Sequence, residues 1–189
     1  MLGHVRVLLM TVAAVVALAA PSGAGAGASD LPSYDERVTS ALDLLASRPE
    51  TADLRQVLES NRVGVQFTSM APGIYARYSV QRRTIEIDSR WTDAEPATLA
   101  AVLAHEATHA QDAVNGYLAA GGASACIDSE VRAFRTSALF WLDAFGPDGK
   151  PIVTSDLERQ LNLIAQREVS DPASLEAVVR QTYTGQCAH

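Results

Sequence analysis

The spacing of apolar residues changes twice along the chain, and this change limits the possible folds more than any other feature. Between Val63 and Asp88, apolar and polar residues alternate, which is typical of β-strands with one buried face. On both sides of this stretch, apolar residues recur every three or four positions, as in amphipathic helices. The sequence therefore predicts an α+β fold that is mostly helical, with short strands between helices.

Three alternating segments and their turns define the expected sheet. The strands are predicted at 63–67, 74–80 and 84–88. Because consecutive short strands joined by tight turns usually pair as neighbours, we expect a three-stranded antiparallel meander. Helices are predicted at 35–47, 52–61, 93–115, 126–144, 155–168 and 172–183, with Asp93 as an N-cap and 116–124 as a loop.

Residues 1–28 have the pattern of a secretory signal peptide. A basic start with His4 and Arg6 precedes an apolar run and a segment of small residues. An uncleaved N-terminal anchor is the alternative. Removal of 28 of the 189 residues leaves 161, which suits a single domain at 29–189. No later run is long enough to cross a membrane, so the sequence predicts a secreted protein, in the extracellular or cell-envelope space, with no membrane contact after cleavage.

Charge and cysteine content limit the possible partners. The chain has 22 acidic and 15 basic residues, so a nucleic-acid binder with a basic surface is not expected. Export would place Cys126 and Cys187 in an oxidising compartment, where we expect them to form a disulfide. The alternative is a pair of free thiols.

A metal-binding pattern lies inside the helix predicted at 93–115. His105 and His109 are four residues apart with Glu106 between them, as HExxH. Residues four apart lie on the same helix face, so two imidazoles there can bind one metal ion. The alternative is a pair of exposed histidines. We expect the face away from the histidines to be buried and the histidines to face a cleft; that buried face comprises Leu99, Leu103, Ala107, Ala110 and Val114.

A catalytic zinc site needs a third protein ligand, and the candidates are Asp112, Asp128 and Glu130. Asp112 continues the histidine helix too far along its axis, so we expect it to support a histidine instead. On the helix predicted at 126–144, Asp128 projects away from the apolar stripe, whereas Glu130 lies at its edge. Glu130 is therefore the expected ligand, and its alternative role is an ion pair with a nearby arginine.

These motifs together resemble the gluzincin zinc metallopeptidases. HExxH is followed about twenty residues later by Glu130, and the segment 130–133 matches the ExxA form of the family's glutamate helix. The preceding strands are similar to those of minimal, single-domain members, so the resemblance implies a zincin-like fold. Two positions depart from the family pattern: Gln111 is polar where an apolar residue is usual, and Phe134 replaces the aspartate of the ExxxD variant.

The resemblance implies a secreted peptidase acting on a peptide or protein substrate. His105, His109 and Glu130 would hold Zn²⁺, and Glu106 would be the general base. The strand at 84–88 would be the sheet edge on which an extended peptide docks.

The group that stabilises the oxyanion is not assigned, and Tyr117 and Tyr183 are the candidates. Two other functions stay open. One is a zinc-containing but non-catalytic secreted binding module, and the other is an exported helical interaction protein with a chance HExxH.

Overall fold

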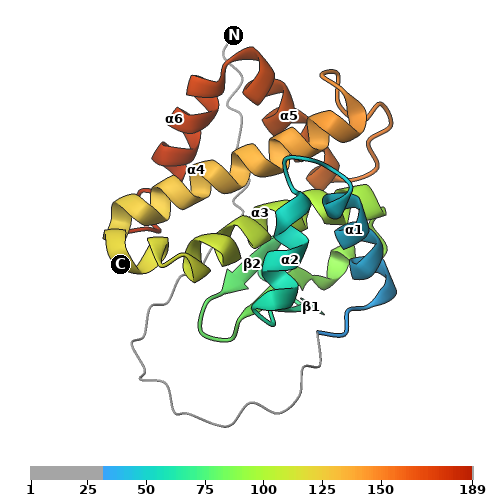
Figure 1. The fold of residues 1–189 in the computed structure, drawn as a ribbon. Helices are drawn as coiled ribbons and strands as arrows, with labels where there is room; N and C mark the ends of the chain where they lie inside the picture. The colour runs from blue at the N-terminus through green and yellow to red at the C-terminus, as the bar shows by residue number, and fades with distance from the viewer. Residues whose placement is uncertain (1–31, 189) are drawn as a thin grey trace.

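The structure is a computed structural model, and it describes residues 32–188 (Figure 1). The predicted signal peptide lies outside these residues. Within them no helix has the length and apolar character needed to span a membrane. The elements are α1 (Glu36–Ala46), α2 (Ala52–Ser60), β1 (Gly64–Thr68), β2 (Ala76–Ser79), β3 (Thr84–Asp88), the 3-10 helix η1 (Ser89–Trp91), α3 (Pro96–Val114), α4 (Tyr117–Phe145), α5 (Asp156–Ser170) and α6 (Pro172–Tyr183).

The sheet is mixed, so the predicted antiparallel meander is wrong. β3 lies in the middle, parallel to β1 and antiparallel to β2. Only β2 and β3 form the expected hairpin. The connection at 69–75 is long enough to carry the chain past the width of one strand, and β3 fills the gap. Alternation indicates which face of a strand is buried, but it does not indicate which strands are neighbours.

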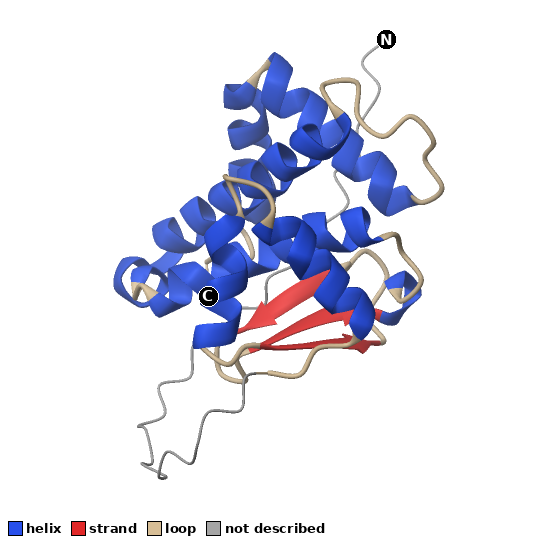
Figure 2. Cartoon of the chain, turned by 45° about the vertical axis from the view of Figure 1, so that its right-hand side comes forward, coloured by secondary structure: helices blue, strands red, loops and turns tan. Residues whose placement is uncertain are grey.

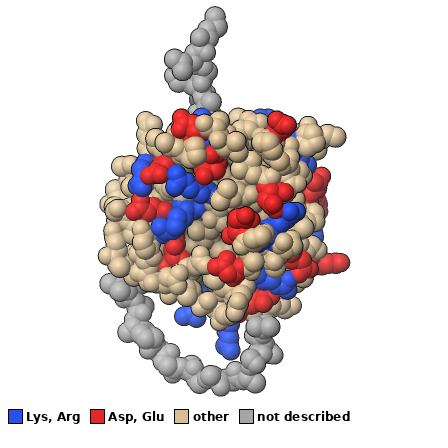
Figure 3. Space-filling model, turned by 45° about the horizontal axis from the view of Figure 1, so that its top comes forward, with Lys and Arg blue, Asp and Glu red and all other residues tan. Residues whose placement is uncertain are grey.

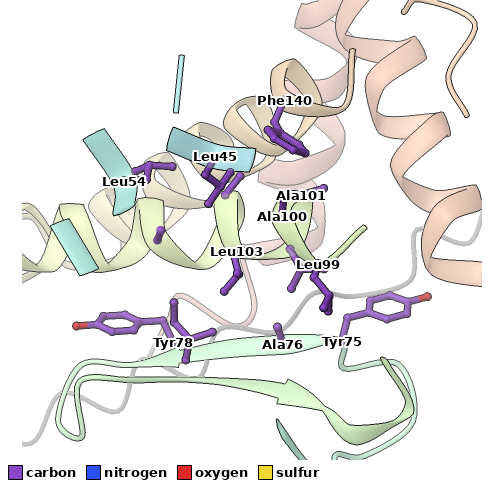
Figure 4. Close-up of a cluster of buried hydrophobic side chains, with 14 of the residues drawn as sticks. Leu45, Leu54, Tyr75, Ala76, Tyr78, Leu99, Ala100, Ala101, Leu103 and Phe140 are labelled. Atoms are coloured by element: carbon purple, nitrogen blue, oxygen red, sulfur yellow. The ribbon is translucent and has the colours of Figure 1, made fainter. Parts of the chain in front are cut away.

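This strand order also contradicts the predicted docking edge. The strand at 84–88 is hydrogen-bonded on both sides and offers no free edge. The two edges are β1 and β2, and β2 is the edge that contacts α3. The side chains of Ala76, Tyr78, Leu99 and Leu103 meet between β2 and α3 (Figure 4). The sheet lies on one side of the molecule, with helices covering one face (Figure 2).

α3 is buried on almost every side, more completely than its sequence predicts. The predicted apolar face is buried except at Val114, which is 49% exposed. α4 packs along the opposite side, and α1 and α2 flank the helix. The close approach of these neighbours depends on small side chains, which let helices pack with little space between them. These are Ala100, Ala101, Ala104, Ala107 and Ala110.

The start of α3 and the loop after it differ from their predictions. Glu95, rather than Asp93, occupies the N-cap because Pro96 forces the preceding residue into an extended conformation, with φ −60° and ψ 148°. The predicted loop at 116–124 is mostly helical. Its break is confined to Gly122, whose φ of 56° and ψ of −143° leave the helical region. Gly116 before it has a φ of 72°.

The predicted disulfide between Cys126 and Cys187 is confirmed, with a Cα–Cα distance of 5.6 Å. It joins the residues after α6 to the beginning of the long part of α4. Because the cysteines are 61 residues apart, the bond restricts the unfolded chain strongly.

Replacing both cysteines with serine is expected to reduce the free energy of unfolding by about 4 kcal/mol. Chemical denaturation of the two proteins at equal pH would measure the difference. Reductant should destabilise the wild type by a similar amount and leave the double variant unchanged. Equal urea midpoints for variant and wild type would contradict this expectation.

Candidate metal centre

Three side chains from two helices converge on one point. The Nε2 atoms of His105 and His109 are 3.2 Å apart. Glu130 lies 3.6 Å from His105 Nε2 through Oε2 and 3.8 Å from His109 Nε2 through Oε1. Donors bound tetrahedrally to one zinc ion at 2.0–2.1 Å are separated by about 3.3 Å. The structure therefore brings the three predicted ligands close enough to hold one metal ion.

The helices α3 and α4 determine this arrangement. The spacing of four residues places both imidazoles on the side of α3 that faces α4. Glu130 and Phe134 follow one turn apart on α4, so the ring of Phe134 packs edge-on against His105 with centroids 4.7 Å apart. Phe134 stands at the position that is an aspartate in the ExxxD variant of the gluzincin motif. It therefore gives His105 an apolar contact instead of a polar one.

A chain of polar contacts orients His109. Its Nδ1 lies 2.8 Å from the hydroxyl of Ser129, and that hydroxyl donates to Asp112 Oδ2 at 2.5 Å. A hydroxyl that donates its proton to a carboxylate accepts from the imidazole, which assigns the proton of His109 to Nδ1. Nε2 is then free to bind a metal. Arg132 forms an ion pair with Asp112 at 2.8 Å and fixes its carboxylate.

Asp112 reaches His109 only indirectly, through Ser129, so its support of a histidine stays a prediction. Ser129 was not among the predicted site residues. Its position directly before Glu130 was the available signal, since adjacent residues on α4 can reach neighbouring ligands on α3.

Several buried polar atoms at this site have no hydrogen-bond partner among the described residues. They are Nδ1 of His105, both oxygens of Glu106 and Oε2 of Glu130. Burying a carboxylate without a partner is costly, and a bound cation would remove much of that cost. The two imidazoles and the carboxylate of Glu130 thus fit a divalent metal ion, and Glu106 adds a buried carboxyl on the residue of α3 that directly follows His105.

Burial controls the protonation of these groups. It lowers the pKa of His105 to about 3, and it lowers the pKa of His109 to about 4 against the opposing charge of Glu130. It raises the pKa of Glu130 to about 7, while His109 acts in the opposite direction. Burial and the charge of Glu130 raise the pKa of Glu106 well above 4.5, with the backbone N–H of Tyr78 opposing. Both imidazoles are therefore neutral at pH 7, which is their metal-binding form.

The cleft expected beside the histidines is not present in this conformation. His105 and Glu106 are 0% exposed, and His109 and Glu130 are each 1% exposed. Only one face of α3 was expected to be covered, whereas α4 covers the other face as well.

Other candidate residues lie outside the cluster. Asp128 forms an ion pair with Arg180 at 2.7 Å and accepts a hydrogen bond from Tyr117 at 3.3 Å. The ring of Tyr117 also contacts the guanidinium of Arg132, 4.1 Å from its centroid. These contacts hold Tyr117 at the outer side of the Asp112 network rather than against the imidazoles.

The second tyrosine and the unusual glutamine have packing roles. Tyr183 is buried and stacks edge-on against Phe134, with centroids 5.7 Å apart. Gln111 donates a hydrogen bond to Asp53 at 2.8 Å and so connects α3 to α2. Its polarity is explained by this contact between helices.

Replacing Ser129 with alanine is expected to weaken zinc binding about 10- to 100-fold, because His109 would lose the acceptor that fixes its tautomer. Competition with a chromogenic chelator would measure the affinity. Ser137→Ala is the matched control, since Ser137 is another buried α4 serine and donates to the Ala101 carbonyl at 2.8 Å. The control should lose stability without losing zinc affinity. Equal affinities for wild type and the Ser129 variant would contradict the assigned role.

Two imidazoles and one carboxylate form a donor set used by more than one kind of metal centre. Zinc hydrolases use it, and so do iron(II) oxygenases that keep open coordination positions. Glu106 is the further feature of this site, because its buried carboxyl accepts no hydrogen bond from any residue of 32–188. No protein-family model, curated protein or solved structure matches the chain, so the arrangement of its own residues must carry any assignment.

Proposed function

We propose that the protein is a zinc-dependent peptidase of the gluzincin type. One observation carries the proposal: the His105, His109 and Glu130 donors surround a single point, and the unpartnered carboxyl of Glu106 is buried with them. A site that only stores a metal has no need of a second buried carboxyl with a raised pKa.

His105, His109 and Glu130 would hold the zinc ion, and Ser129 and Asp112 would keep His109 in its binding tautomer. Bound zinc supplies Lewis acidity, which lowers the pKa of water to about 7 and polarises a carbonyl oxygen. Glu106 accepts the proton of the attacking water and delivers it to the leaving amine. Burial and the charge of Glu130 raise its pKa, which makes it a stronger base than an exposed glutamate.

β2 is the strand on which we propose that the substrate docks. The Asp88 N–H donates to the Tyr75 carbonyl at 2.8 Å, so these two residues form a hydrogen-bonded pair of the antiparallel ladder. The pairs alternate along the strand, and the backbone groups of Ala76 and Tyr78 therefore point away from β3. An extended peptide can add to this free edge, next to Glu106 on α3.

The closed conformation supports one competing function, a zinc-containing binding module without catalysis. In that case the burial of the donors would protect a structural ion permanently. A peptidase instead needs a segment that opens. The segment 117–121 suits this role because Gly116 and Gly122, both with positive φ, bound it.

Secretion remains part of the proposal. The disulfide and the absence of a membrane-spanning helix among residues 32–188 are compatible with export. The signal peptide at 1–28 would be tested by N-terminal sequencing of the exported protein.

The experiment that tests the function combines metal analysis with a peptide-library assay. We expect one zinc per chain and hydrolysis that chelator abolishes and zinc restores. Zinc without hydrolysis would favour the binding module. Stoichiometric iron would favour redox chemistry, and the absence of any metal would leave only an accidental motif.

A further inference from the structure

A cavity of about 340 Å³ opens where the edge of β2 meets the C-terminal end of α3. This volume is within the range of small-ligand pockets, roughly 300–1,000 Å³. Its walls combine apolar and polar groups: Asn61, Tyr78, Val80, Arg83, Ala113 and Val114. Val80 and Val114 are 39% and 49% exposed, so both apolar side chains are accessible to a ligand in the cavity.

The cavity is aligned with the proposed catalytic site. Leu99, Glu106 and Ala113 follow at intervals of seven residues, nearly two helical turns, so they share one side of α3. Leu99 points to the sheet in Figure 4. Ala113, in the cavity wall, is about 10 Å along the axis from Glu106. An extended peptide advances about 3.3 Å per residue, so this distance corresponds to about three residues.

Among the described residues that line the cavity, Arg83 alone carries a charge. Neither Arg83 nor Arg62 forms an ion pair with another described residue, whereas Arg77 and Arg82 both pair with Glu86. Elsewhere, on the face shown in Figure 3, basic and acidic side chains are interspersed. A free arginine is therefore notable in a chain with a net charge of −7.

The backbone at Arg62 and Arg83 also departs from the usual pattern. Arg62 and Arg83 have φ values of 53° and 47°, in the left-handed region that glycine and asparagine prefer. They lie at the same end of the sheet, because the Gly64 N–H donates to the Arg83 carbonyl at 2.8 Å. Residues retained in costly backbone conformations are often functional.

We propose that this cavity binds an acidic side chain of the substrate, about three residues from the scissile bond. The inference rests on the proposed function, and it names the class of substrate as peptides with a glutamate or aspartate at that distance. The Arg83 guanidinium pairs with the carboxylate, while Val80 and Val114 contact the side-chain methylenes. Glutamate fits this combination better than aspartate because it has the longer apolar stem.

Binding can be tested without catalysis. Fluorescent peptides that differ only by Glu, Gln or Lys at each position would be titrated by anisotropy against the zinc-loaded Glu106→Gln protein. We expect the Glu peptide to bind about fivefold more tightly than the Gln peptide at one or two positions, as for a partly exposed ion pair. Arg83→Gln should remove the preference, and Arg83→Glu should transfer it to the Lys peptide.

Arg82→Gln is the matched control, because Arg82 lies in the same turn and its charge is used by Glu86. It should retain the preference for Glu. The proposal is overturned if Glu and Gln peptides bind equally, if the preference survives in Arg83→Gln, or if no peptide binds. Chelator-sensitive cleavage of neutral peptides by the wild type would, in each of those cases, leave the peptidase function intact. Arg83-dependent binding without any cleavage would instead support only the acidic subsite.

Discussion

Replacing Glu106 with glutamine is expected to reduce peptide hydrolysis at least 10²- to 10⁴-fold while the metal content stays near one ion per chain. Glutamine has almost the same shape but cannot accept a proton from water. His105, His109 and Glu130 are unchanged, so the metal affinity should change little. Turnover of a quenched fluorescent peptide and metal analysis of the same sample would measure both quantities.

Glu95→Gln is a suitable control for this substitution. Glu95 precedes α3 directly, and its side chain is 61% exposed and pairs with Lys150. This control should retain full activity. The folded stability of the Glu106 variant should equal or exceed that of the wild type at pH 7, because a buried carboxyl with a raised pKa is costly when ionised. Retained hydrolysis in Glu106→Gln would remove Glu106 from the mechanism.

Removing the metal is expected to destabilise the fold substantially. A ligand present at a thousand times its dissociation constant stabilises the native state by about 4 kcal/mol. For a domain of this size, each kcal/mol corresponds to roughly 2–4 °C, so chelation should lower the melting temperature by about 8–16 °C. Calorimetry with and without chelator would measure this change. Identical melting temperatures would show that His105, His109 and Glu130 hold no metal.

The stability of the metal-free protein depends on pH because burial shifts the pKa values of the metal donors. Without metal, the pKa of Glu130 is raised from 4.5 to about 7, so the stability it contributes is complete below pH 4.5 and is lost as the pH rises through 7. The pKa values of His105 and His109 are lowered from 6.5 to about 3 and about 4, so their contribution is lost as the pH falls from 6.5 through those values.

Metal binding should therefore become weaker below pH 7, and for a specific reason. The imidazoles are already neutral there, whereas Glu130 must release a proton before it can bind. We expect the zinc affinity to fall about tenfold per pH unit below pH 7, with one proton released per ion, as measured by calorimetry in buffers of different ionisation enthalpy. If the zinc affinity begins to fall only near pH 4, protonation of the histidines rather than of Glu130 limits binding.

The helices could be predicted from the sequence because their signals are local. Pro172 and Tyr183 bound α6 as predicted, and Gly146 ends α4. The convergence of His105, His109 and Glu130 was also within reach, since helical spacing and the apolar stripe of α4 indicate which side chains face each other.

The remaining features depend on contacts between distant segments. The path of residues 69–75 determines which strand pairs with β1. The spacing of apolar residues does not predict that path. Ser129 stands next to Glu130 in the sequence, but its partners His109 and Asp112 are determined by the packing of α3 against α4. The same holds for the cavity beside Arg83, because its walls come from α2, the β2–β3 hairpin and α3. The local sequence determines which side of each helix or strand is apolar. Tertiary packing determines which of these apolar sides contact one another.

The burial of the metal donors has a kinetic consequence. When solvent cannot reach His105, His109 or Glu130, an ion can enter or leave only during a transient opening of the chain. The rate of metal exchange would then be independent of chelator concentration above a threshold, and it would equal the opening rate. If 117–121 is the segment that opens, the same rate would limit how often a substrate can enter. Exchange of a radioactive zinc isotope would thus measure, in the resting protein, an upper bound on turnover.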